Sequence, residues 1–152
     1  MNKTQKRLEQ ILPKIRSDAL LNNRGRGGEI GFYIFDYDPK DELIVRDYVC
    51  YLMKQFTQIG SPVRPIHFDL YELMMEILKR KKVLDRIVPM EEKEGRDRVF
   101  KAVKSVLQPE CFIEIIQERM EDHNLVLITG VGKVWPFVRS HSVLNNLHHV
   151  LD

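Results

Sequence analysis

Charged and polar side chains follow three apolar segments that are typical of β-strands. Asp36 and Asp38 follow the first segment, Asp69 follows the second, and the turn 130–133 follows the third. Ligands of open α/β sheets collect outside the carboxyl ends of the strands. Carboxylates suit Mg²⁺, and a glycine turn with a cation suits phosphate, because backbone N–H groups can approach the anion. One hypothesis is therefore a degenerate, Mg²⁺-dependent nucleotide- or phosphate-binding enzyme.

The turn Gly130-Val-Gly132-Lys133 does not match a phosphate-binding P-loop. That motif needs a glycine five residues before the Gly-Lys pair and Ser or Thr after the lysine. Leu127 and Val134 occupy these two positions, so the hydroxyl ligand for Mg²⁺ is missing. We expect no ordinary ATP hydrolysis, and the glycines are better explained by a tight turn that exposes two backbone amides.

The three carboxylates also have structural explanations. Asp38 and Asp69 stand directly before predicted helices, where Asp is a preferred N-cap, and Pro39 suits the first helical position. Asp36, at a strand end, can hydrogen-bond a loop. We therefore expect these acids to hold no metal.

Three further candidates follow the turn. His141 lacks a cysteine nucleophile and has Asn145 where a second ligand would stand, so a structural or interface histidine is favoured over a general base or ligand. Arg139 could neutralise an anion beside it. Trp135 is either a core residue or an anchor for a partner protein.

The elements that would position these residues alternate between helix and strand. The apolar spacing predicts an amphipathic helix over 4–21, which Pro13 kinks or splits. Strands are predicted over 29–37, 63–69 and 124–129, with helices from 38 to 58, from 70 to 79, over 83–107 with a charged hinge, over 110–121 and from 137. The first strand is apolar on both faces, which favours the middle of a covered sheet. This order predicts an α/β fold: a three-layer Rossmann-like domain with a short, mostly parallel sheet of about three to four strands flanked by helices.

Composition narrows the class of protein. The 152 residues suit one domain, 1–152, and the apolar and charged fractions of 43% and 30% exclude a disordered chain and a membrane protein. The net charge of +2 does not by itself argue for DNA binding. No apolar run or signal peptide is visible, so we expect a cytoplasmic protein. Two cysteines, Cys50 and Cys111, exclude a disulfide scaffold and are expected to be buried free thiols.

The stretches 28–42, 68–71 and 128–147, the last with its Gly-Val-Gly-Lys turn and its Asn-Asn-Leu sequence, resemble the BrxB family of bacterial BREX (bacteriophage exclusion) defence systems. The resemblance runs from about residue 4 to the end of the chain. It implies a small cytoplasmic protein that works beside the phosphatase-like PglZ, the BrxC ATPase and the PglX adenine methyltransferase in DNA methylation and phage restriction. Members usually continue beyond the last helix, so we expect the chain to be shortened at its C-terminus relative to the family.

The resemblance supplies no catalytic residues, cofactor or metal. The candidate binding or interaction residues are Asp36, Asp38, Asp69, Gly130, Gly132, Lys133, Trp135, Arg139 and His141.

These observations favour a non-catalytic adaptor that docks PglZ, with DNA involved only indirectly. The alternative is the Mg²⁺-dependent enzyme described above, using the strand-end acids and Lys133. Direct DNA contact through Arg24, Arg26 and the run 79–82 is a third option.

Overall fold

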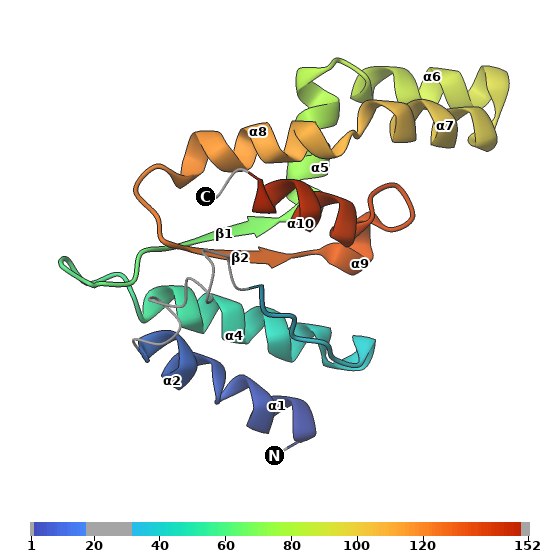
Figure 1. The fold of residues 1–152 in the computed structure, drawn as a ribbon. Coiled ribbons are helices and arrows are strands. Elements are labelled where there is room, and N and C mark those ends of the chain that lie inside the picture. The colour runs from blue at the N-terminus through green and yellow to red at the C-terminus, as the bar shows by residue number, and fades with distance from the viewer. Residues whose placement is uncertain (1, 18–31, 150–152) are drawn as a thin grey trace. The chain divides into compact units, whose positions relative to one another are not determined.

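The computed structural model describes residues 2–17 and 32–149 of the chain (Figure 1). Helices dominate these residues, and their sheet has two strands, β1 (Pro65–Asp69) and β2 (Leu125–Thr129). The prediction of a three-layer Rossmann-like domain with three to four strands is therefore wrong. The described residues divide into two compact units, one formed by 2–17, 32–66 and 122–126 and the other by 67–121 and 127–149.

The missing strand is the one that was predicted over 29–37. Residues 32–37 lie outside any strand or helix, and 29–31 fall outside the described residues. The side chains of Tyr33 and Ile34 are 66% and 82% exposed. A β-strand forms only where a neighbouring strand pairs with its backbone groups. The apolar pattern of a segment favours its burial, but it does not provide that neighbouring strand.

The predicted N-terminal helix is split in the first unit. α1 (Lys3–Leu8) has Asn2 as its N-cap, and the Asn2 side chain accepts a hydrogen bond from the backbone N–H of Gln5 in a capping box. α2 (Ile11–Arg16) carries Pro13 in its first turn, where the missing N–H group has no helical partner to lose. The break at 9–10 is thus a consequence of Pro13. Residues 18–21 of the prediction lie outside the described residues.

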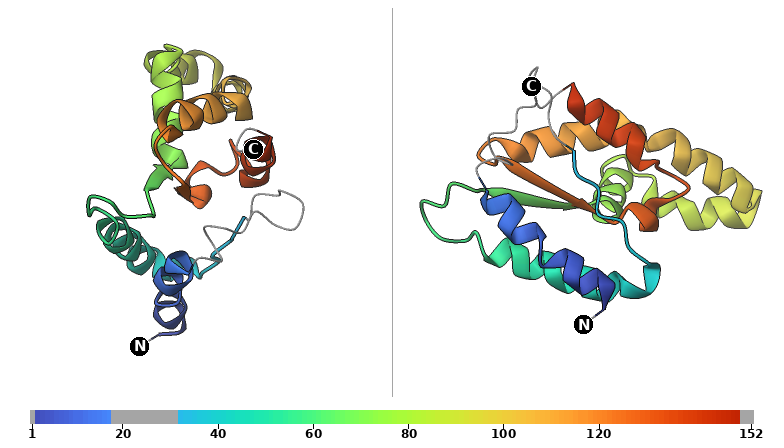
Figure 2. Two further views of the ribbon diagram at one scale, coloured as in Figure 1. Left: turned by 60° about the vertical axis from the view of Figure 1, so that its left-hand side comes forward. Right: turned by 60° about the horizontal axis from the view of Figure 1, so that its bottom comes forward.

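The next helix begins as predicted at Asp38, whose carboxylate accepts from the backbone N–H of Lys40. A short 3₁₀ turn, η1 (Pro39–Asp41), leads into α4 (Glu42–Lys54). Asp41 is buried, and its two carboxylate oxygens accept from Thr4 Oγ1 at 2.6 Å and Asn2 Nδ2 at 2.9 Å. These bonds fasten the start of α1 to the start of α4, and Figure 2 shows the two helices side by side.

β1 and β2 run in the same direction (Figure 1). Where the pair begins, the backbone N–H of Asn124 donates to the carbonyl of Arg64, and the Asn124 side chain accepts from the N–H of Arg64. At the other end of the pair, the His67 and Thr129 side chains are hydrogen-bonded. The carboxyl ends of both strands therefore reach the same edge, as the sequence predicts for a parallel pair.

The second unit has an apolar core built by helices. α5 (Leu70–Arg80) and α8 (Pro109–Met120) pack together, α9 (Val131–Val134) lies against α5, and α10 (Ser140–His148) lies against α8. The buried side chains of these helices are Leu70, Leu73, Met74, Ile77, Leu78, Phe112, Ile113, Ile115, Ile116, Val134, Val143 and Leu147. Their three- and four-residue spacing is the one that the sequence predicts.

The predicted charged hinge within 83–107 is confirmed as the turn of a helical hairpin. α6 (Leu84–Glu94) and α7 (Arg96–Val106) lie side by side and meet at Gly95, which has a φ of 81° (Figures 1 and 2). α6 has no buried residue and α7 has only Val103, so the hairpin is largely solvated.

Two expectations from composition have different outcomes. Cys50 is exposed, so its predicted burial is wrong, whereas Cys111 is half-buried. Within residues 2–17 and 32–149, no helix combines the length and the apolar composition that crossing a bilayer requires.

Candidate functional site

The ends of β1 and β2 bring together three of the residues that the sequence singled out. Lys133, on α9, donates from Nζ to Asp69 Oδ2 at 2.6 Å. Asp69 also caps α5 as predicted, because its Oδ1 accepts from the backbone N–H of Tyr71 at 2.9 Å. The residue that ends β1 is thus locked to the helix that follows β2.

Gly130 makes this close approach possible. It has a left-handed backbone conformation with a φ of 77° and stands directly before α9. A Cβ atom added there would collide with the carboxylate of Asp69 and lie 3.2 Å from the backbone nitrogen of Leu70. Gly130 is therefore required both by its own backbone and by the position of Asp69.

The structure adds a second contact across the strand pair, between His67 Nε2 and Thr129 Oγ1 at 2.7 Å. Partial desolvation of the ring lowers the pKa of His67 from its ordinary value. Sequence reasoning did not single out His67. It stands two residues before Asp69 in β1, and this period-two spacing, together with Thr129 at the end of β2, was the signal that could have found it.

The electrostatics of the pair argue against a Mg²⁺ or phosphate site at this edge. Burial raises the pKa of Asp69, but the hydrogen bonds from Lys133 and from the backbone of Tyr71 outweigh it, and the pKa lies below its ordinary value. Asp69 is therefore charged and already has a donor on each oxygen, and its charge neutralises that of Lys133. Among the described residues, no group of three or more His, Cys, Asp or Glu side chains could hold a metal ion.

The other two predicted carboxylates belong to the first unit and have partners there. Asp36 pairs with Arg7 at 2.7 Å, and the hydrogen bond from this guanidinium lowers the pKa of Asp36. Asp38 caps η1 and pairs with Lys40 at 3.0 Å. Their expected meeting with Asp69 depended on the strand 29–37, which the described part of that segment does not form.

The remaining candidates lie on the exposed surface of the second unit. Gly132 lies in α9, with open space where a Cβ would be. Trp135 follows α9 and is 69% exposed, so it is not a core residue. Arg139 stands at the N-cap of α10 and His141 in the first turn of that helix, where its side chain is exposed. Within the described part of the chain, the ion pairs of Asp69 and Lys133 involve neither Arg139 nor His141.

Comparisons with known proteins identify the family. A family model described as "BREX protein BrxB" matches residues 66–152. A Bacillus cereus protein named "BREX protein BrxB" is 42% identical over 156 residues, which cover 100% of this chain and 81% of that protein. An Escherichia coli protein of the same name is 29% identical over 147 residues, which cover 95% of this chain and 72% of that protein. No solved structure matches. The resemblance drawn from the sequence motifs is confirmed: the chain belongs to the BREX protein BrxB family.

Proposed function

We propose that this chain is a non-catalytic adaptor that binds the phosphatase-like PglZ protein and supports assembly of a methylation and restriction complex with BrxC and PglX. Membership of the BREX protein BrxB family gives the chain a role in a BREX defence system. The adaptor role, the partners, the cytoplasmic location and the lack of catalysis are parts of the proposal.

The observation that carries this proposal is a group of exposed apolar side chains around the strand ends. Tyr71 follows Asp69 by two residues, and Val131 and Trp135 flank Lys133 at the end of the other strand. Their exposed fractions are 41%, 42% and 69%. We call Tyr71, Val131 and Trp135 the strand-end surface. Exposed aromatic side chains at adjoining strand ends favour a protein interface, because Trp and Tyr are enriched among the few residues that dominate the binding energy of such interfaces.

The ion pair beside the strand-end surface supports docking over chemistry. The side chains of Asp69 and Lys133 are 14% and 36% exposed and neutralise each other at 2.6 Å. A partner surface that covers this pair buries no unpaired charge, and burial of an unpaired charge is what destabilises a complex most. A group that must hold Mg²⁺ or bind phosphate would instead need this carboxylate or this ammonium to be free.

Binding of the full chain to purified PglZ, measured by calorimetry at micromolar concentration, tests the proposal. Trp135→Ala removes the most exposed side chain of the strand-end surface, and we expect about 30-fold weaker binding, the loss typical of an interface hot spot. Val88→Ala on α6 is the matched control, because Val88 is 63% exposed but lies outside that surface, and it should bind normally. If wild-type chain and PglZ do not associate, or if the two variants bind equally well, the proposal is wrong.

A further inference from the structure

The second unit contains a strongly basic segment. Residues 79–106, from the end of α5 through the α6–α7 hairpin, contain ten Lys or Arg and five Asp or Glu, a net charge of +5. The chain as a whole has 24 and 22, a net charge of +2, so everything outside this segment sums to −3. The near-neutral total of the chain therefore conceals a strongly basic segment in the second unit.

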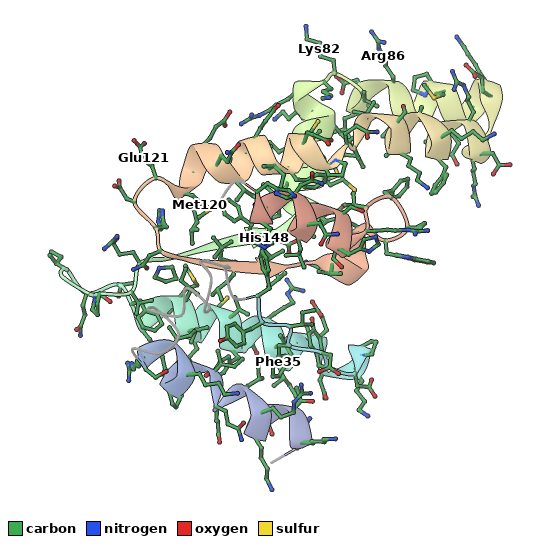
Figure 3. All side chains as sticks on the ribbon, in the orientation of Figure 1. Phe35, Lys82, Arg86, Met120, Glu121 and His148 are labelled. Atoms are coloured by element: carbon green, nitrogen blue, oxygen red, sulfur yellow. The ribbon has the colours of Figure 1, made fainter. Side chains whose placement is uncertain are left out.

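Ion pairs neutralise some of these cations and leave others. Arg80 pairs with Glu76, and at the tip of the hairpin Arg96 and Arg98 pair with Glu91 and Glu94. Over residues 79–86, by contrast, four exposed cations have no ion pair in the described part of the chain: Lys79, Lys81, Lys82 and Arg86. We call these four residues the basic surface. Figure 3 shows Lys82 and Arg86 pointing outward from the same side of the hairpin base.

The position of Lys82 is not explained by the needs of the backbone. α5 ends in a Schellman motif, in which Val83 N–H donates to the carbonyl of Leu78 and Lys82 N–H to that of Lys79. Lys82 occupies the left-handed position of this motif with a φ of 56°, where glycine is preferred because it has no Cβ. A lysine here costs backbone stability and contributes an exposed cation.

The chemistry of the basic surface fits a polyanion with regularly spaced charges. Lysine is depleted from the cores of protein interfaces, in which aromatic side chains are enriched. Residues 79–86 contain three of these lysines and no aromatic residue, which argues against a protein partner. A nucleic-acid duplex presents one negative charge per about 1.7 Å of its axis, so a cluster of cations can contact several phosphates of one duplex. We propose that the basic surface, Lys79, Lys81, Lys82 and Arg86, binds the phosphate backbone of a nucleic-acid duplex without reading its base sequence.

Fluorescence anisotropy with the full chain and two DNA duplexes of about 20 base pairs and unrelated sequence tests this inference. Four phosphate contacts give a slope of log K against log salt of about −3.6, so affinity should fall about 100-fold between about 50 and 200 mM salt. Both duplexes should bind equally. Lys82→Gly removes one cation and should reduce the slope by about 0.9 and the affinity at about 50 mM salt by about tenfold. Because glycine suits the backbone there, its melting temperature should be equal to or higher than that of the wild type.

Lys93→Ala is the matched control, since it removes the same charge from the tip of the hairpin, outside the basic surface. It should keep the slope and affinity of the wild type. Absence of binding at low salt, a Lys82→Gly slope equal to that of the wild type, or an equal effect of Lys93→Ala would each overturn the inference. So would binding to vesicles of anionic lipid with no binding to DNA. None of these outcomes depends on PglZ, so they are separate from the test of the adaptor.

Discussion

Substitution of Gly130 by alanine should destabilise the second unit strongly for so small a change. The left-handed backbone at Gly130 costs a non-glycine residue about 1–2 kcal/mol. The added Cβ would also collide with the carboxylate of Asp69, which must then move. Moving it breaks the cap of α5, a loss of about 0.5–2 kcal/mol. The expected loss in the free energy of unfolding is therefore about 1.5–4 kcal/mol.

Urea and thermal unfolding followed by circular dichroism measure this loss. For a chain of this size, a loss of about 3 kcal/mol corresponds to a fall in Tm of about 6–12 °C. Gly132→Ala is the internal control, because Gly132 lies in α9 and nothing lies within 4 Å of the position that its methyl group would take. Alanine favours a helix by about 0.5–1 kcal/mol, so this variant should be neutral or slightly stabilised.

The two parts of the effect can be separated in a double-mutant cycle. In an Asp69→Ala background the collision is absent, so Gly130→Ala should cost only the backbone term of about 1–2 kcal/mol. A Gly130→Ala variant as stable as the wild type would refute the reasoning, and so would a cost that is unchanged by Asp69→Ala.

Two further predictions concern buried and paired carboxylates. Thr4→Val leaves one carboxylate oxygen of the buried Asp41 without its hydrogen-bond donor, so the free energy of unfolding of the first unit should fall by about 1–3 kcal/mol. Proteolysis of the α1 segment should become faster. Thr57→Val, at an exposed position, is the control. Lys133→Met removes the partner of Asp69, whose pKa is below its ordinary value of 3.8 in the folded chain. A carboxyl group with a lowered pKa in the folded state stabilises that state at pH values above its ordinary pKa, and this stabilisation is lost as the pH falls through the folded pKa. The difference in free energy of unfolding between wild type and Lys133→Met, measured by urea unfolding, should therefore be larger at neutral pH than at about pH 3. An equal difference at both pH values contradicts this assignment.

Two helix starts and one helix-to-helix turn were predictable because their signals are local, whereas the helix predicted to run to 58 ends at Lys54 and the one predicted from 137 begins at Ser140. Asp38 and Asp69 cap the helices that they were predicted to begin, and the charged hinge of 83–107 is the turn at Gly95. Each signal acts within one helical turn, so the residues that decide the boundary are close together in the sequence. The split at Pro13 belongs to the same class.

The first strand was not predictable because its outcome depends on distant residues. The apolar segment 32–37 has the pattern of a covered strand, yet Tyr33 and Ile34 are exposed. The candidate site follows the same division. Asp69 and Lys133 meet because β1 and β2 are neighbours, whereas Asp36 required a strand that the described residues do not form. Residue type and spacing predicted the chemistry available at each strand end, but the pairing of strands decided which ends meet.

The two proposed surfaces lie at opposite ends of one rigid element. Asp69 caps the N-terminus of α5 beside the strand-end surface, and Lys82 follows the C-terminus of α5 in the basic surface. The eleven residues of α5 span about 16 Å, and five of them are buried in the core of the second unit. A protein partner and a duplex could therefore occupy the chain together without competing for the same side chains. Accordingly, Trp135→Ala should leave the affinity for DNA unchanged and Lys82→Gly should leave the affinity for PglZ unchanged. A variant that weakened both would show that the two surfaces are not independent.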